Sequence, residues 1–130
     1  MTKTVYMDKY PIFSLSIEKS ECQYDTIEAI LEALKAKVEA HPIAKFIAVF
    51  NNYEHTKSLE GEIAPEILDA RNLVFCFGQA IPNSKILAVR PRSIGICETK
   101  ERFILDFLEA PKEQMHATME AWVKSLINVA

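Results

Sequence analysis

Residues 93–108 read SIGICETKERFILDFL, and this stretch decides the fold. Apolar and polar residues alternate on both sides of Lys100-Glu101, and a period of two is typical of a β-strand with one buried face. With Lys100-Glu101 as a two-residue turn, Glu98 lies opposite Phe103 and Ile96 lies opposite Leu105. The stretch therefore predicts an antiparallel hairpin with strands at 93–98 and 102–108.

The two faces of this hairpin differ in polarity. One face is apolar except near the turn, and it predicts part of a core. The opposite face is mixed and carries Ser93, Gly95, Cys97, Ile104, Asp106 and Leu108. A mixed face is either the solvent side of an antiparallel sheet or a surface that meets a ligand or partner, and a glycine there lets another molecule come close.

Outward from the hairpin, the patterns predict further strands at 12–18, 46–50, 73–77 and 86–89. Between them, residues 51–61 are polar and are expected to form a loop. Residues 65–71 are expected to form one or two helical turns, with Pro65 at the first helical position.

Two helices are expected, one on each side of this run of strands. The first opens with Asp25 as its cap and ends at Pro42, with an apolar stripe of Ile27, Ile30, Leu31, Leu34 and Val38. The second begins at Pro111, with Met115, Met119, Trp122 and Leu126 in its stripe. Consecutive strands between two helices predict a single α+β domain over 1–130, in which a mainly antiparallel sheet has both helices on one face.

Composition excludes several classes of protein. The chain has 130 residues, of which 49% are hydrophobic and 25% charged, and its formal net charge is -3. An acidic balance argues against binding to nucleic acid or to anionic membranes. The longest apolar runs are far shorter than a membrane span, and the first ten residues lack the apolar core of a signal peptide. Three cysteines without a C-x-x-C pair indicate reduced thiols and a cytoplasmic protein.

The segment from Phe46 to Leu108 has a recognisable order of features. An apolar strand is followed by His55, Gly61, the strand LVFCFG at 73–78 and Arg90-Pro91-Arg92 before the hairpin. This order resembles the bacterial domain-of-unknown-function family 302. The resemblance implies the order strand–helix–four strands–helix, with a curved sheet backed by two helices. That family has no established biochemical function, so the resemblance implies nothing about chemistry.

Five residues are candidates for ligand binding. His55 lies in the polar stretch, where an imidazole can donate, accept or bind a metal, although a solvated or backbone-capping histidine is the simpler alternative. Arg90 and Arg92 can form a fork for a carboxylate or phosphate, or they can protect a strand edge from aggregation. Cys97 and Asp106 belong to the mixed face of the hairpin.

The other histidines favour structural roles. His41 ends a helix, where the helix dipole favours a cation. His116 precedes Glu120 by four residues, which favours an exposed ion pair over a metal site.

The leading hypothesis is a non-enzymatic module that binds a small ligand, of which a small anion is the candidate, or a protein partner. Neither a cofactor nor a metal is expected. The alternative is a small enzyme or redox protein that uses His55 with Cys76 or Cys97. This chemistry requires the imidazole to lie within hydrogen-bond reach of the thiol, either directly or through one water. We also expect a homodimer, because an open sheet has free edges and the mixed face is partly apolar.

Overall fold

Strands β5 (Arg92–Glu98) and β6 (Arg102–Leu108) form the expected hairpin. Glu98 pairs with Phe103 and Ile96 pairs with Leu105, as predicted. Across the turn, the N–H of Thr99 donates to the carbonyl of Arg102 at 2.9 Å. The sequence therefore predicted the register of the central hairpin correctly.

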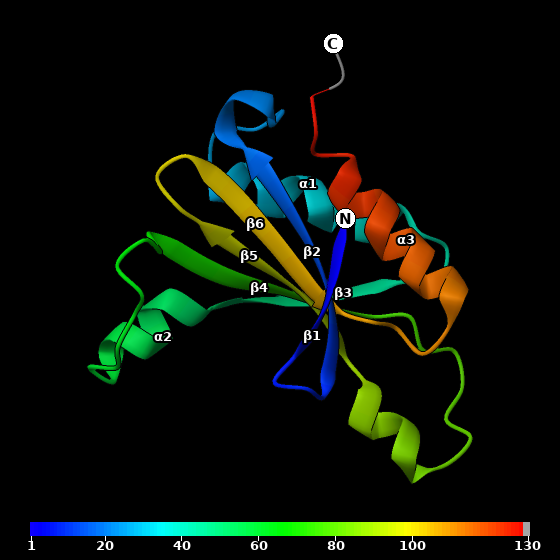
Figure 1. Ribbon diagram of the computed structural model, residues 1–130. Coiled ribbons are helices and arrows are strands. Elements are labelled where there is room, and N and C mark those ends of the chain that lie inside the picture. The colour runs from blue at the N-terminus through cyan, green and yellow to red at the C-terminus, as the bar shows by residue number, and fades with distance from the viewer. Residues whose placement is uncertain (129–130) are drawn as a thin grey trace.

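The computed structural model describes residues 1–128 and places this hairpin inside a six-stranded sheet (Figure 1). The strand order is β1-β2-β6-β5-β4-β3, and every neighbouring pair is antiparallel. The four outer strands are β1 (Thr2–Tyr6), β2 (Tyr10–Glu18), β3 (Lys45–Asn51) and β4 (Asp69–Cys76).

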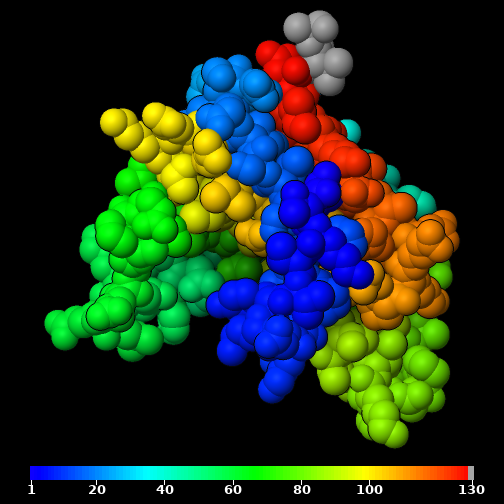
Figure 2. Space-filling view, in the orientation of Figure 1, coloured from blue at the N-terminus to red at the C-terminus, as the bar shows by residue number. Residues whose placement is uncertain are grey.

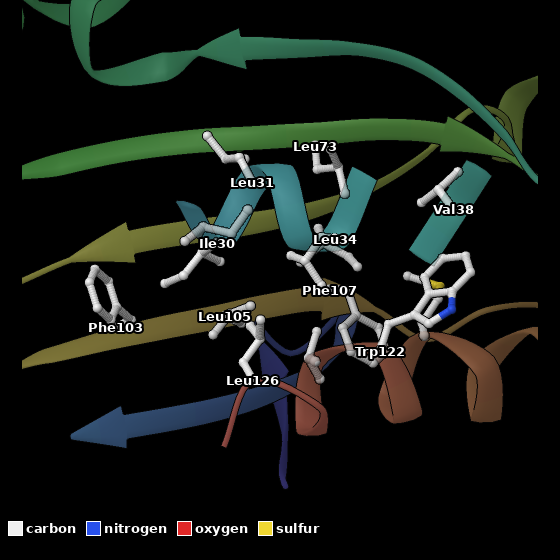
Figure 3. Close-up of a cluster of buried hydrophobic side chains, with 14 of the residues drawn as sticks. Ile30, Leu31, Leu34, Val38, Leu73, Phe103, Leu105, Phe107, Trp122 and Leu126 are labelled. Carbon is white, nitrogen blue, oxygen red and sulfur yellow. The ribbon is translucent and has the colours of Figure 1, made fainter. Parts of the chain in front are cut away.

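Helices α1 (Ile27–Ala40) and α3 (Glu113–Lys124) cover one face of the sheet (Figure 1). Their apolar stripes meet the inward residues of the strands in one core (Figure 3). The core includes Leu34 from α1, Val123 from α3, and Leu73, Ile94 and Leu105 from the sheet. Each fully buried side chain of this kind stabilises the fold by roughly 1.5–3 kcal/mol. The predicted α+β class is confirmed, and the order strand–helix–four strands–helix holds from β2 to α3, with two additions: a strand before it (β1) and a short helix within it.

An aromatic cluster closes one end of the core. Trp122 stacks on Phe77, with ring centroids 5.4 Å apart, and meets Phe75 edge-on at 5.5 Å. The ring of His41 lies 5.4 Å from that of Phe77, and its Nδ1 accepts N–H groups of Ile43 and Ala44, both at 3.2 Å. His41 is thus a structural residue that fixes the chain after α1 by accepting backbone hydrogen bonds.

Both expected helix starts were placed too early. The N-cap of α1 is Thr26 instead of Asp25, because the hydroxyl of Thr26 accepts the N–H of Ala29 at 3.1 Å. Helix α3 begins at Glu113 with Lys112 as its N-cap, two residues after Pro111.

The N-terminal strand β1 was not predicted. It joins β2 through a tight turn in which Met7 and Asp8 both have positive φ, 53° and 57°. The N–H of Lys9 closes this turn on the carbonyl of Tyr6 at 3.1 Å. Turns of this kind usually carry Asn-Gly, so Met-Asp gave no signal for a hairpin.

Residues 51–61 and 65–71 were also predicted incorrectly. The first stretch contains helix α2 (Asn52–Ser58), because the side chain of Asn51 accepts the N–H of Glu54 at 3.0 Å and caps it. In the second, β4 already begins at Asp69, where it pairs with Glu98 of β5. Tertiary pairing has overridden the local helical preference there.

Residues 86–89 do not form a strand. They lie in a 3₁₀ segment, η2 (Ser84–Val89), whose N-cap Asn83 accepts the N–H of Lys85 at 2.9 Å. Their apolar side chains line cavities instead of packing in a sheet: Ile86 and Val89 line one cavity and Leu87 lines another. A second short 3₁₀ segment, η1 (Lys19–Glu21), links β2 to α1.

Candidate functional site

A cavity of about 260 Å³ lies between the segment 77–92 and the start of α3. We call it the basic cavity, because its charged lining residues are Arg90, Arg92 and Lys112. The rest of its wall is mostly apolar and is formed by Phe77, Gly78, Gln79, Ala80, Pro82, Ile86, Val89, Pro111 and Met115. Figure 1 shows the segment after β4, drawn green to yellow-green, projecting from the sheet beside the start of α3.

Arg92 is the most buried of the three cations, with 8% of its surface exposed. It is the first residue of β5 and pairs with Phe75 in β4, so it lies at the end of the sheet near the aromatic cluster. Its Nη2 donates to the carbonyl of Leu108, whereas its Nε has no hydrogen-bond partner within residues 1–128. Burial lowers the pKa of the Arg92 guanidinium from its usual value.

Arg90 is held by the backbone of the same segment. Its Nη1 donates to the carbonyl of Ala80 at 2.8 Å. Its guanidinium lies so close to Gly78 that a Cβ at that position would come 2.4 Å from the guanidinium carbon. Glycine at residue 78 therefore makes the space that Arg90 occupies.

The cations of the basic cavity lack carboxylate partners in the described part of the chain. The ion pairs found there use Lys3, Lys19, Arg71, Arg102 and Lys124 instead. Among the lining residues there is also no Asp or Glu. The cavity is therefore locally positive in a chain whose net charge is -3.

The N-terminus of α3 forms another part of this wall. Lys112 stands at the N-cap, where its side chain offers no acceptor, and it caps no backbone N–H. The N–H of His116 donates to the carbonyl of Lys112 at 3.1 Å and is the first intrahelical donor, so the amides of Glu113, Gln114 and Met115 have no acceptor within the helix. These amides and the helix dipole favour a negative charge at this end.

The sheet face away from α1 and α3, called the open face below, carries a row of polar residues across neighbouring strands. Ser14 pairs with Asp106, Asp106 with Gly95, and Gly95 with Asn72. The hydroxyl of Ser14 donates to the Asp106 carboxylate. Asn72 makes 3.0 Å hydrogen bonds to two more side chains on this face, Ser93 and Asn52. In Figure 2 a hollow lies between the blue β1–β2 hairpin and the green region of α2, which flank this face.

The residues singled out from the sequence lie in three different places. Arg90 and Arg92 line the basic cavity, whereas Cys97 and Asp106 lie on the open face. His55 lies on α2, with its ring 5.3 Å from that of Phe50. The sequence thus pointed to the cavity through the two arginines, and it grouped with them residues of other surfaces.

Cys97 is poorly suited to nucleophilic chemistry. Burial raises the pKa of its thiol, and the carboxylate of Asp106 raises it further. The reactive form of a cysteine is the thiolate, which these surroundings disfavour. Arg102, the arginine near Cys97 in the sequence, pairs with Glu18 at 2.7 Å.

His116 does not pair with Glu120. Its ring packs against those of Phe13 and Phe107, at centroid distances of 4.2 and 5.4 Å. Glu120 instead lies 3.5 Å from Lys124, one turn further along α3. The prediction of an exposed ion pair was therefore wrong, because the imidazole ring packs against aromatic side chains of β2 and β6 instead.

Neither a metal centre nor a membrane-spanning helix appears among the described residues. No group of three or more His, Cys, Asp and Glu side chains in residues 1–128 is arranged to hold an ion. Likewise, no helix in this part of the chain is long and apolar enough to cross a membrane.

Comparison with known families gives a match over nearly the whole chain. The model of a family of unknown function, DUF6858, matches residues 1–128. The chain belongs to DUF6858. The expectation of a family without established function is thus confirmed, and the family shown is DUF6858. No curated protein matches the chain.

In this member of DUF6858, sequence reasoning missed most of the basic cavity. Lys112 and Met115 were read only as parts of a helix, and Ile86 and Val89 as parts of a strand. Two signals were available: a lysine at an N-cap position, and an apolar run directly before Pro91, where continued strand pairing is disfavoured. Neither signal shows that these segments meet around Arg92.

Proposed function

We propose that this protein is a non-enzymatic module that binds a small anionic ligand in the basic cavity. One observation carries the proposal: Arg92 is almost fully buried and has no carboxylate partner within residues 1–128. A buried charge without a partner is costly, and buried arginines are usually paired. An anion in the cavity would supply the missing partner.

The neighbouring groups support the same proposal. Arg90, Lys112 and the uncapped amides of α3 add positive potential on other sides of the cavity. Catalysis by His55 with Cys97 has less support, since burial raises the pKa of that thiol. The observations therefore favour binding over thiol chemistry.

The test is a titration of the isotope-labelled full chain with small anions at constant ionic strength, followed by backbone amide NMR. We expect at least one of phosphate, sulfate, acetate and hexanoate to give saturable shifts at Gly78–Ala80 and Glu113–Met115. The same anion should give no saturable shift in Arg92→Met. Arg102→Met is the matched control, because Arg102 lies at the opposite end of β6, about 20 Å from Leu108. If no anion saturates these amides, or if Arg92→Met responds like the wild type, the proposal is wrong.

We further propose that the protein is a bacterial cytoplasmic homodimer. Three free thiols suit a reducing compartment, whereas bacterial origin rests on the family resemblance alone. The edge strand β3 exposes Ile47, Val49 and Phe50, and Leu108 of the open face is also exposed. Burial of such residues between two copies would explain their apolar character. Sedimentation at rising micromolar concentration tests this, and a constant mass near 14.8 kDa would refute it.

A further inference from the structure

The wall of the basic cavity is divided between charge and apolar surface. Positive groups come from Arg92, Arg90 and Lys112, whereas Phe77, Ile86 and Met115 belong to the apolar part of the wall. A ligand that suits both parts has a negative head and an apolar body. A purely inorganic anion would leave the apolar wall without a partner, and a neutral hydrocarbon would leave Arg92 unpaired.

The charge of the head follows from how many cations are buried. Arg92 is the one cation of the three with a largely buried side chain, since Arg90 is only half-buried and Lys112 is exposed. One desolvated positive charge is balanced by one negative charge, whereas a second negative charge would face Arg90 and Lys112, which are already solvated and gain little from it. The geometry therefore favours a monoanion over a dianion such as phosphate.

The size of the ligand follows from the volume. Pockets for drug-sized ligands measure roughly 300–1,000 Å³. The basic cavity, at about 260 Å³, lies just below that range. Its ligand should therefore be small, with a short chain or a single ring as its apolar body.

We infer that the ligand class is a small monocarboxylate with an apolar body, whose carboxylate lies between Arg92 and the N-terminus of α3. This inference rests on the proposed anion-binding function and narrows its ligand class. Carboxylates suit this position because two oxygens can accept from a guanidinium and from backbone amides together. The apolar body then replaces water against Phe77, Ile86 and Met115.

The experiment is calorimetric titration of the full chain with three probes that separate charge from apolar body. Hexanoate has both, hexan-1-ol has the body without the charge, and inorganic phosphate has charge without the body. We expect hexanoate to bind at least ten-fold more tightly than either of the others. Arg92→Met should weaken hexanoate binding roughly ten- to hundred-fold, the usual effect of losing a hydrogen bond to a charged group. Arg102→Met should leave it unchanged.

Each failure has a distinct meaning. If hexan-1-ol binds as tightly as hexanoate, the carboxylate contributes nothing and the inference is wrong. If phosphate binds more tightly than hexanoate, the monocarboxylate class is wrong although anion binding itself stands. Absence of binding by all three probes and by sulfate and acetate would remove the proposed function as well. If Arg92→Met fails to fold, Lys112→Asp provides the same test from the helix side, because its carboxylate would occupy the N-terminus of α3 and should abolish hexanoate binding.

Discussion

Gly78 and Arg90 share one space: a Cβ on residue 78 would lie 2.4 Å from the guanidinium carbon of Arg90. The contact joins the end of β4 to the residue just before Pro91, across the whole intervening segment. It fixes where the Arg90 side chain can lie and hence the shape of the cavity wall that Arg90 forms.

Gly78→Ala should therefore displace Arg90 while costing little stability. The displaced group is the far end of a flexible side chain, so we expect the free energy of unfolding to fall by less than about 1 kcal/mol. Chemical denaturation measures this stability change. A double-mutant cycle with Arg90→Met, followed by amide NMR, checks the mechanism: once Arg90 is removed, Gly78→Ala should have no further effect on the amide shifts of the cavity residues. Equal effects in both backgrounds would mean that the backbone at residue 78 is itself strained.

Arg92→Met should leave the ligand-free protein as stable as the wild type or more stable. Burial disfavours the charged form, as the lowered pKa of Arg92 indicates, and methionine removes that penalty. The lost hydrogen bond is to the carbonyl of Leu108, a residue exposed enough for water to replace it. Thermal and urea unfolding measure the change. A loss above about 2 kcal/mol, the range for an unsatisfied buried group, would make Arg92 a structural residue.

Lys112→Asp should separate helix stability from ligand binding. Aspartate at the N-cap accepts a backbone N–H and complements the helix dipole, so the unfolding free energy should rise by about 0.5–2 kcal/mol. Thermal unfolding followed by circular dichroism measures this gain. Lys124→Asp, at the other end of α3, is the matched control and should destabilise, because an anion there opposes the dipole and the pair with Glu120 is lost. A loss of stability in Lys112→Asp would show that the N-terminus of α3 is already satisfied.

Alkylation of Cys97 should begin only at alkaline pH. Its pKa lies above the usual 9.0 because of burial and then Asp106, so the thiolate is scarce at neutral pH. The shift also predicts that Cys97 contributes to stability below pH 9 and that this contribution is lost as pH rises through the folded-state pKa. Residue-resolved mass spectrometry of iodoacetamide labelling measures the profile. Asp106→Asn should move the labelling profile to lower pH, whereas an unchanged profile would leave burial and the other nearby carboxylates, Glu66, Asp69 and Glu98, as the cause.

The sequence predicted the parts of the fold that depend on residue periodicity. The 93–108 hairpin and both apolar helix stripes follow from spacings of two and of three to four residues, and burial enforces them. It did not predict β1, because the turn at Met7-Asp8 uses positive φ values in residues that seldom adopt them. Helix α2 was missed because it is short, polar and nucleated by a single cap, Asn51.

The candidate site was predictable only in part, for a related reason. Arg90 and Arg92 stand out as a pair, and an anionic ligand follows from their chemistry. Lys112 joins them only because β6 returns the chain to the same end of the sheet before α3 begins. No local pattern encodes that meeting, and an apolar run such as 86–89 reads alike whether it pairs in a sheet or lines a cavity.

The segment after β4 has two sides that belong to different hollows. Gly78, Gln79, Ala80 and Arg90 line the basic cavity, and they also line a more open hollow on the other side, beside Ile47 and Cys76. Because the two hollows share these four residues, a molecule that displaces them in the basic cavity also changes the room in the second hollow. Ligand uptake would then be felt at the outer edge of the sheet, where the Cys76 thiol is placed to report it.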